Sequence, residues 1–223
     1  MSTIAINSVD CILTDIYSYG KKDFASYISV FQNVYPLLKS EGTCWIIFKS
    51  LDKCLSPLFT HKFQIEMLSM GWILRNELIY KTDDLCNSSN FVSNYYKILF
   101  YVKNKKYYFN IQYEKIPEST YRRMQRIIDH RETYDPKKHK TDVTGHAQIS
   151  YKMLIRSAQK VLDSKGKLPR SVRGESENIY EKILLTGCPP NGIVFNPLYN
   201  SKTIINESKR LGMIPYKNKE DYY

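Results

Sequence analysis

The sequence of 223 residues contains no apolar run as long as the ~18–20 residues that a membrane-spanning helix needs. Its first ten residues, MSTIAINSVD, lack a basic region followed by an apolar stretch, so we expect no secretory signal. Cysteine is scarce, and the five cysteines are an odd number without a Cys-x-x-Cys pair. This pattern favours free thiols in a reducing compartment over a disulfide framework. We therefore expect an intracellular chain.

Several signatures of catalytic sites are also missing. The chain has neither the Gly-x-Ser-x-Gly turn of a hydrolase nor a glycine-rich phosphate loop. Its four histidines do not form a set of metal ligands, because His139 and His146 are seven residues apart in a polar loop without nearby cysteine. We expect no bound metal, and phosphate contacts or plain solvation as the roles of these two histidines.

Positive charge is what the chain has in excess. It carries 33 lysines and arginines against 22 acids, a net charge of +11. The window 103–174 alone holds 18 basic and 7 acidic residues, so the whole surplus lies there and the rest of the chain is neutral. This segregation indicates an element that faces a polyanion on an otherwise balanced domain, with a solvated insertion as the alternative.

Segments typical of strands and helices alternate through the first hundred residues. The short apolar run 9–15, VDCILTD, ends in polar residues as buried strands do. Residues 24–38 carry apolar side chains at helical spacing, and we expect the glycine of the following KSEG to close that helix. The other segments predicted here are a strand at 43–48, a helix at 56–71, and strands at 72–82 and 94–104. Such alternation predicts an α/β sheet with helices on its faces.

The window 104–174 interrupts this alternation. Residues 119–134 and 147–166 are predicted as helices, and no strand is evident in the window. We therefore predict one domain over 1–223 with a basic, mainly helical insertion at 104–174. After the insertion the pattern resumes with a helix in 175–188, a strand at 192–195, a further helix and a final short strand.

The order of these segments resembles the β-group of amino-methylating DNA methyltransferases, which modify adenine N6 or cytosine N4. In that family a strand with a catalytic Asp-Pro-Pro-Tyr turn comes first, and a target-recognition region follows. The strand and Phe-x-Gly-x-Gly turn that bind S-adenosylmethionine come last. Here SVDCILTDIYSYG stands at the catalytic position and NGIVFNPLYNSKT at the cofactor position. The resemblance covers most of 7–103 and 175–216. It implies a Rossmann-like S-adenosylmethionine-dependent methyltransferase fold with the basic helical insertion at the recognition position.

The catalytic turn departs from the family's pattern. Asp15 matches the acid that, with a proline carbonyl, holds the target amine of a flipped-out base. Ile16 and Tyr17 stand at the two proline positions and Ser18 at the aromatic one, although one inserted residue would make Tyr19 the aromatic. The resemblance thus implies Asp15, Tyr17 and Tyr19 as a degenerate catalytic set. Prolines fix the backbone that aims the carbonyl, and a ~1 Å error can cost ~100-fold in rate, so we expect this turn to be non-functional.

The cofactor turn departs further. FNPLYNSKT aligns with the family's Asp-Pro-Phe-x-Gly-Ser-Gly-Thr, with Asn200 and Lys202 at the two glycines. Lys202 adds a long cationic side chain that opposes the sulfonium charge of the cofactor. We expect no cofactor, or S-adenosylmethionine if the chain is active. The cofactor-binding residues that the resemblance implies, in degenerate form, are Asn196, Pro197, Leu198, Asn200, Ser201 and Lys202.

The basic window supplies the candidate nucleic-acid contacts. Arg122, Arg123 and Arg126 share one arc of the first predicted helix, where they can follow a phosphate backbone. The polar loop after the helix extends this charge through Lys137, Lys138 and Lys140. A solubilising face and docking to an acidic partner are the alternatives for these residues.

Three functions remain open from the sequence. The first is a catalytically silent methyltransferase-like protein that binds DNA, completes a complex with an active methyltransferase subunit, or forms a homodimer, in the cytoplasm or nucleus. The second is an active but divergent adenine-N6 or cytosine-N4 methyltransferase that uses Asp15 and Tyr19. The third is a protein-interaction scaffold without a nucleic-acid role.

Overall fold

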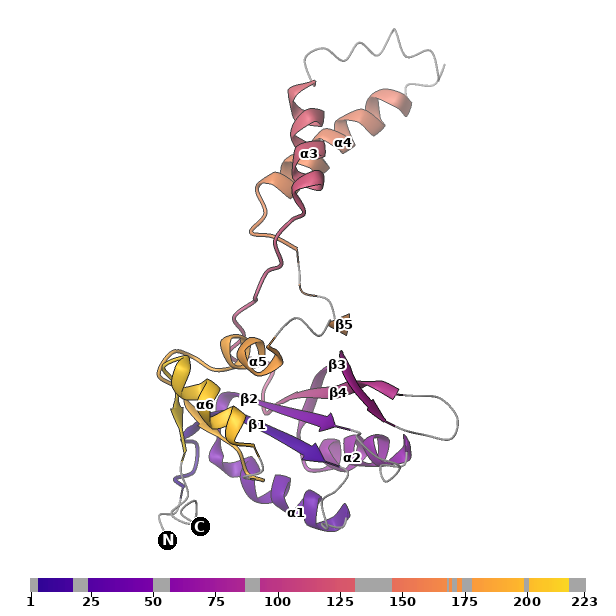
Figure 1. The fold of residues 1–223 in the computed structure, drawn as a ribbon. Coiled ribbons are helices and arrows are strands. Elements are labelled where there is room, and N and C mark those ends of the chain that lie inside the picture. The colour runs from indigo at the N-terminus through magenta and orange to yellow at the C-terminus, as the bar shows by residue number, and fades with distance from the viewer. Residues whose placement is uncertain are drawn as a thin grey trace. The chain divides into compact units, whose positions relative to one another are not determined.

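The structure is a computed structural model, and the chain forms two compact units (Figure 1). The first unit combines Met1–Asn110 with Arg170–Tyr223, and the second is Ile111–Pro169. The residues that the structure describes are 4–17, 24–49, 57–86, 93–130, 146–167, 169, 172–173, 178–198 and 201–216.

A mixed sheet forms the centre of the first unit. Within the described residues it has seven strands in the order β5-β3-β4-β2-β1-β6-β7. The strands β2, β1, β6 and β7 run parallel, whereas β4 is antiparallel to both β2 and β3. The strand bounds are β1 Val9–Tyr17, β2 Leu38–Lys49, β3 Ile73–Cys86, β4 Ser93–Val102, β5 Val172–Arg173, β6 Ile193–Phe195 and β7 Ile214–Pro215.

Helices cover both faces of this sheet (Figure 1). On one face lie α1 (Phe24–Val34) and α2 (Pro57–Ser69), and on the other lie α5 (Ile179–Gly187) and α6 (Lys202–Arg210). Both faces of the central strands are therefore buried, which explains their nearly continuous apolar runs. The mixed α/β fold predicted from the sequence is confirmed.

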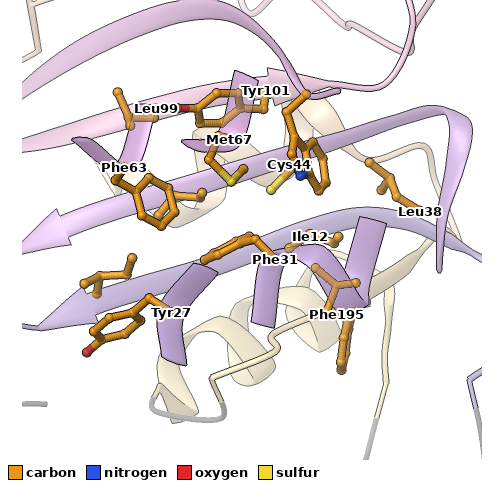
Figure 2. Close-up of a cluster of buried hydrophobic side chains, with 14 of the residues drawn as sticks. Ile12, Tyr27, Phe31, Leu38, Cys44, Phe63, Met67, Leu99, Tyr101 and Phe195 are labelled. Atoms are coloured by element: carbon orange, nitrogen blue, oxygen red, sulfur yellow. The ribbon is translucent and has the colours of Figure 1, made fainter. Parts of the chain in front are cut away.

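Alternate residues of each strand feed two separate cores. In β1, Ile12 and Ile16 pack with Phe31 of α1 and Phe63 of α2 (Figure 2). The rings of Phe31 and Phe63 meet edge to face at 5.3 Å between centroids. Leu13, which points to the opposite face, packs in the core formed with α5 and α6. This two-residue period decides which side chains of β1 and β2 face α5.

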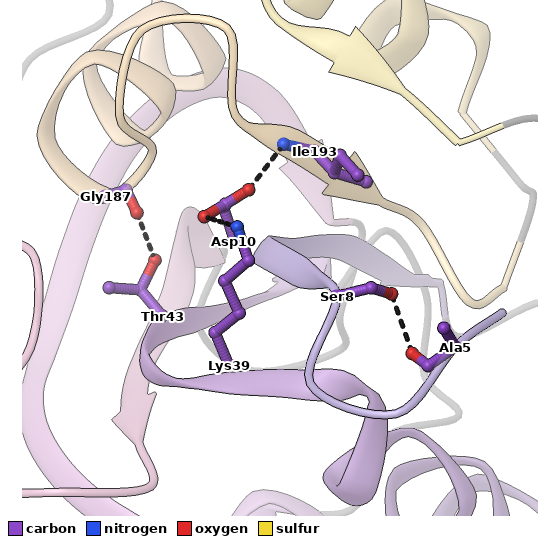
Figure 3. Close-up of polar contacts among 7 residues, drawn as sticks. All are labelled: Ala5, Ser8, Asp10, Lys39, Thr43, Gly187 and Ile193. Atoms are coloured by element: carbon purple, nitrogen blue, oxygen red, sulfur yellow. Dashed lines mark hydrogen bonds and ion pairs between the residues drawn. The ribbon is translucent and has the colours of Figure 1, made fainter.

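Polar contacts fix the strands β1, β2 and β6 against one another (Figure 3). The carboxylate of Asp10 accepts the backbone N–H of Ile193 at 2.8 Å and pairs with Lys39 Nζ at 2.7 Å. Thr43 donates its hydroxyl to the carbonyl of Gly187 at 2.6 Å, and this bond holds the end of α5 on β2. In the same view, the Ser8 hydroxyl donates to the carbonyl of Ala5 at 2.7 Å. The first and last thirds of the chain are thereby joined at the centre of the sheet.

Two predicted boundaries were wrong. The helix predicted over 24–38 ends at Val34 and is followed by the 3₁₀ turn Tyr35–Leu37, because Pro36 cannot donate a helical hydrogen bond. The KSEG segment does not close a helix but lies inside β2, where Leu38 pairs with Val9. The prediction of no strand in 104–174 also failed, since β5 pairs with β3.

The second unit is a pair of helices. These are α3 (Glu118–Asp129) and α4 (His146–Leu162), which pack together, and an antiparallel bridge between Glu114 and Lys167 closes the unit at its base. Both helices were predicted, with slightly longer bounds. In the described part of the chain, no helix is long and apolar enough to cross a membrane.

Candidate functional site

The carboxyl ends of β1 and β6 mark the point where the chain's connections diverge. From β1 the chain passes through α1 to β2 on one side, and from β6 it passes through α6 to β7 on the other. In open α/β sheets, ligands bind in the crevice beyond such a switch point. Asp15 lies near the end of β1, and Asn196 follows directly after β6. The catalytic and cofactor positions predicted from the sequence are thus adjacent in the fold.

Asp15 is the centre of a buried polar cluster. Its side chain is fully buried, and its Oδ2 lies 3.0 Å from Lys49 Nζ in an ion pair. The hydroxyl of Tyr180 donates to the same oxygen at 2.7 Å. Lys49 also donates to the Tyr180 hydroxyl, so the three groups form a closed triangle.

Aromatic rings enclose the ammonium of Lys49. Its Nζ lies 4.9 Å from the ring centroid of Tyr180 and 5.6 Å from that of Tyr96. Rings at these distances attract a cation through their electron-rich faces. The Lys49 side chain is only 13% exposed, so little solvent screens its attraction to Asp15.

Local structure explains how distant residues meet here. Asp15 follows Cys11 and Leu13 on the β1 face that α5 covers, and Lys49 follows Trp45 and Ile47 on the same face of β2. Since β1 and β2 are parallel and end together, both polar side chains reach the same edge. Tyr180 is placed there by the start of α5, where Asn178 caps the helix by accepting the N–H of Glu181.

This arrangement uses the acid internally. In a site that holds a target amine, the carboxylate must accept a hydrogen bond from that amine. Here Oδ2 of Asp15 already accepts from a hydroxyl and pairs with an ammonium. An amine of a base would have to compete with Lys49, whose charge makes it the stronger hydrogen-bond donor.

The turn after β6 is built around Asn196. Its Oδ1 accepts the Thr14 hydroxyl at 2.8 Å and the backbone N–H of Leu198 at 3.2 Å. The first bond joins the cofactor turn to the catalytic strand, and the second forms the local turn typical of asparagine. The Nδ2 of Asn196 is buried, and within the described residues it has no hydrogen-bond partner. Asn196 therefore acts first as a structural link between β6 and β1.

The other predicted cofactor residues are only partly brought together. Pro197 and Leu198 lie in the turn with Asn196, and Leu198 packs against the α1–α2 core. Ser201 is buried at the start of α6, whereas Lys202 is exposed as the first residue of that helix. Asn200 lies outside the described residues.

The remaining predicted catalytic and nucleic-acid residues divide in the same way. Tyr17 ends β1, but its side chain is outside the described part, as is all of Tyr19. The three arginines of α3 are exposed, and Arg122 pairs with Glu118 at 2.9 Å. The predicted loop residues Lys137, Lys138 and Lys140 lie outside the described residues.

Three cysteines of the described chain are buried free thiols: Cys11, Cys44 and Cys188. Burial raises the pKa of the Cys44 thiol well above its ordinary value, and this suits a packing role rather than a reactive one. Across the described residues, no group of three or more histidines, cysteines and acids gathers as metal ligands would.

Sequence reasoning missed Lys49, Tyr96, Tyr180 and Thr14. The two-residue period of β1 and β2 carried a usable signal, because it places Asp15 and Lys49 on one face of neighbouring strands. Tyr180 offered no such signal, since it lies 165 residues from Asp15.

Comparison with known protein families decides the assignment of this fold. The family model described as DNA methylase, for N6 and N4 methyltransferases, matches residues 19–223. The chain belongs to this DNA methylase family. The match begins after Asp15, so the place of that residue at the switch point comes from the fold. A search of curated proteins gave no match.

Solved structures agree with this family. The M1.HpyAVI–SAM complex aligns with a TM-score of 0.53 at 17% identity, covering 96% of this chain and 84% of that one. The cytosine-N4-specific PvuII DNA methyltransferase aligns at 0.58 and 12% identity, covering 96% and 75%. A DNA modification methylase from Thermus thermophilus, TTHA0409, aligns at 0.57 and 14% identity, covering 99% and 85%. The chain has the Rossmann-like fold of S-adenosylmethionine-dependent methyltransferases, as predicted from the sequence.

Proposed function

We propose that this DNA methylase family member is catalytically silent, and that it binds DNA or serves as the partner subunit of an active methyltransferase inside the cell. The single observation that carries the proposal is the ion pair between Asp15 and Lys49, with Tyr180 on the same carboxylate oxygen. The acid at the catalytic position is held by the protein's own ammonium rather than presented to a base.

The rest of the catalytic turn supports the same interpretation. Ile16 and Tyr17 continue β1 as regular strand, paired with Phe48 and Lys49 of β2. Extended strand geometry at these positions differs from a rigid proline turn that aims a carbonyl away from the sheet. The residues therefore lack the device that would orient a target amine for in-line transfer.

The cofactor turn fits S-adenosylmethionine poorly. From 196 to 202 the sequence NPLYNSK contains no acid and no glycine. The Asn196 amide oxygen is already used by Thr14 and Leu198, and Lys202 brings a positive charge to the start of α6. A sulfonium ligand would meet a cation here where it needs neutral or negative groups.

The basic second unit supports DNA as the ligand. Arg122, Arg123 and Arg126 are exposed on α3, and exposed arginines suit contacts to phosphate oxygens. Such contacts would give sequence-independent binding that weakens as salt rises.

An active, divergent adenine-N6 or cytosine-N4 methyltransferase is the second candidate. It is favoured by the retention of Asp15 at the switch point, next to the turn that Asn196 joins to β1. In this candidate Lys49 would have to leave Asp15 when the target base enters.

Calorimetry with S-adenosylmethionine separates the two candidates. We expect the isolated, purified chain to release no heat of binding at micromolar cofactor and to transfer no methyl group to duplex DNA. Fluorescence anisotropy with the same DNA should show binding at low salt. Micromolar cofactor binding together with methyl transfer by the isolated chain would overturn the silent assignment. Absence of DNA binding would leave the partner-subunit or scaffold role, which co-purification with an active methyltransferase tests.

A further inference from the structure

The helix α2 is apolar on two opposite sides. Its inner side places Phe63 and Met67 in the core with no exposed surface. Its outer side carries Leu58, Ile65 and Leu68, whose side chains are 62%, 66% and 50% exposed. A helix that is apolar all round is usually buried on both sides, and contiguous exposed apolar groups mark interaction surfaces.

A groove runs along this outer side. It has a volume of about 570 Å³ and is formed by the start of α1 together with α2. The floor is apolar, and the only charged groups of its lining are Lys62 and Glu66, one helical turn apart on α2. The lining residues are Phe24, Leu58, Phe59, Lys62, Ile65 and Glu66.

We propose that the groove is the contact surface of a homodimer, in which α2 packs antiparallel against α2 of a second copy across a two-fold axis. A two-fold contact must be self-complementary, so that each residue finds its counterpart's partner in the other copy. The order of charges on α2 meets this condition. An axis at the level of Gln64 sets Lys62 of each copy opposite Glu66 of the other.

The same axis also brings the apolar residues together. With a rise of about 1.5 Å per residue, Leu58 of one copy lies within about 3 Å, along the axis, of the level of Leu68 in the other. Ile65 lies close to the axis and meets its own counterpart. A parallel pairing would instead set Lys62 against Lys62 and Glu66 against Glu66, which costs free energy. The charges therefore select the antiparallel arrangement.

This dimer goes beyond the proposed function and does not depend on it. The α1–α2 face lies across the sheet from α5, which carries Tyr180 of the polar cluster. A silent and an active chain would form the same contact.

Sedimentation equilibrium of the purified full chain, over a wide concentration range, tests the association. We expect a monomer–dimer equilibrium, and Ile65→Arg should raise the dimer dissociation constant by about 30-fold or more, as for loss of a central contact residue. Met153→Arg is the matched control, because Met153 is 61% exposed on a helix of the other unit, and it should leave the equilibrium unchanged. Circular dichroism and a thermal melt confirm that each variant is folded.

A charge exchange tests the register. Lys62→Glu alone and Glu66→Lys alone should each weaken the dimer, on the order of tenfold or more, because each sets like charges opposite each other. The double variant, and an equimolar mixture of the two single variants, should restore association. The proposal is overturned if the wild-type chain stays monomeric at every concentration, or if it dimerises with an affinity that Ile65→Arg does not change. Single charge variants that dimerise as the wild type does would overturn the antiparallel register.

Discussion

The carboxylate of Asp15, near the end of β1, lies 3.0 Å from the ammonium of Lys49, the last residue of β2. The Tyr180 hydroxyl binds the same oxygen, and the rings of Tyr96 and Tyr180 flank the ammonium. The pair closes the gap between two neighbouring parallel strands at the edge where this fold binds its ligands. It is therefore both a structural element and the reason that we assign a silent function.

Breaking this pair should be costly for stability. Lys49→Met leaves the buried Asp15 carboxylate without its ammonium, and we expect a loss of about 3–5 kcal/mol in the free energy of unfolding. Asp15→Asn removes the other partner and should also destabilise. The double variant should lose clearly less than the sum of the two, since neither charge is left alone. Urea denaturation of all four chains gives the coupling free energy. Additive losses would mean that the two charges do not interact.

The charge at the cofactor turn gives a second prediction. Lys202→Ala removes a cation from the start of α6, so any residual affinity for S-adenosylmethionine should rise. Two unit charges about 4 Å apart in water repel by about 1 kcal/mol, so a gain of up to roughly fivefold is expected. Lys209→Ala, an exposed lysine in the last turn of α6, is the control and should give no gain. Calorimetry at high cofactor concentration measures both. Equal affinities in the two variants would show that Lys202 does not oppose the cofactor.

Sequence reasoning found one half of the candidate site. Asp15 was predicted because it ends an apolar strand at a position matched by a known motif. Lys49 looked like an ordinary polar end of a strand until the parallel pairing of β1 and β2 placed it beside Asp15. Tyr180 comes from a helix that follows the insertion, and only the packed fold brings it to the strand. Contacts of this range depend on tertiary packing rather than local pattern.

The fold itself was largely predictable, since apolar periodicity and order identify most of its elements. Boundaries failed where tertiary hydrogen bonds prevailed. The carbonyls of Pro36 and Leu37 accept the N–H groups of Asn7 and Ser8, and this draws the end of the predicted helix into the turn before β2. The two-residue strand β5 was too short to give any pattern.

The packing of α5 on the sheet predicts an effect of one methyl group. A Cβ added to Gly187 would lie 2.7 Å from Thr43 Oγ1 and still closer to Trp45 Nε1. The Trp45 ring cannot move easily, because it stacks on Phe100 with 4.0 Å between centroids. Gly187→Ala should therefore destabilise by about 1–3 kcal/mol in urea denaturation. Trp45→Phe removes the Nε1 atom, so the double variant should lose less than the sum of the singles. An unchanged midpoint for Gly187→Ala would show that this contact is looser than the structure indicates.

Acid sensitivity should depend in part on Glu77. Burial alone would raise the pKa of its carboxyl, but hydrogen bonds from Lys97 and Gln64 outweigh burial and lower the pKa below its usual 4.5. A depressed pKa means that the folded state favours the ionised carboxylate. The stabilisation is thus present above the pKa of the unfolded chain, and it is lost as pH falls through the lower folded value.

Glu77→Gln removes this titration. The urea midpoint of the wild type should fall more steeply than that of the variant between neutral pH and about pH 3, and the two curves should converge at the acid end. Because the pair is partly exposed, its contribution should be only about 0.2–1 kcal/mol. Glu41→Gln, at an exposed position of β2, is the control and should follow the wild type. Parallel pH curves for Glu77→Gln and wild type would contradict the assigned cause.

The exposed arginines of α3 should set the salt dependence of DNA binding. Replacing Arg122, Arg123 and Arg126 together by glutamine keeps good helix formers but removes three positive charges. Each lost phosphate contact lowers the slope of log affinity against log salt by about 0.9 on duplex DNA. The triple variant should therefore bind more weakly at low salt, with a slope reduced by up to about 2.7.

A variant of equal net charge separates contact from general attraction. Lys105, Lys106 and Lys209 are exposed in the first unit, and their replacement by glutamine removes the same three charges. If α3 contacts the phosphates, this control should keep the wild-type slope and lose little affinity. If both triple variants weaken binding equally, the attraction comes from net charge and α3 has no special role. If neither changes it, the arginines form a solvated face, and the interaction scaffold without a nucleic-acid role becomes the better account of the basic unit.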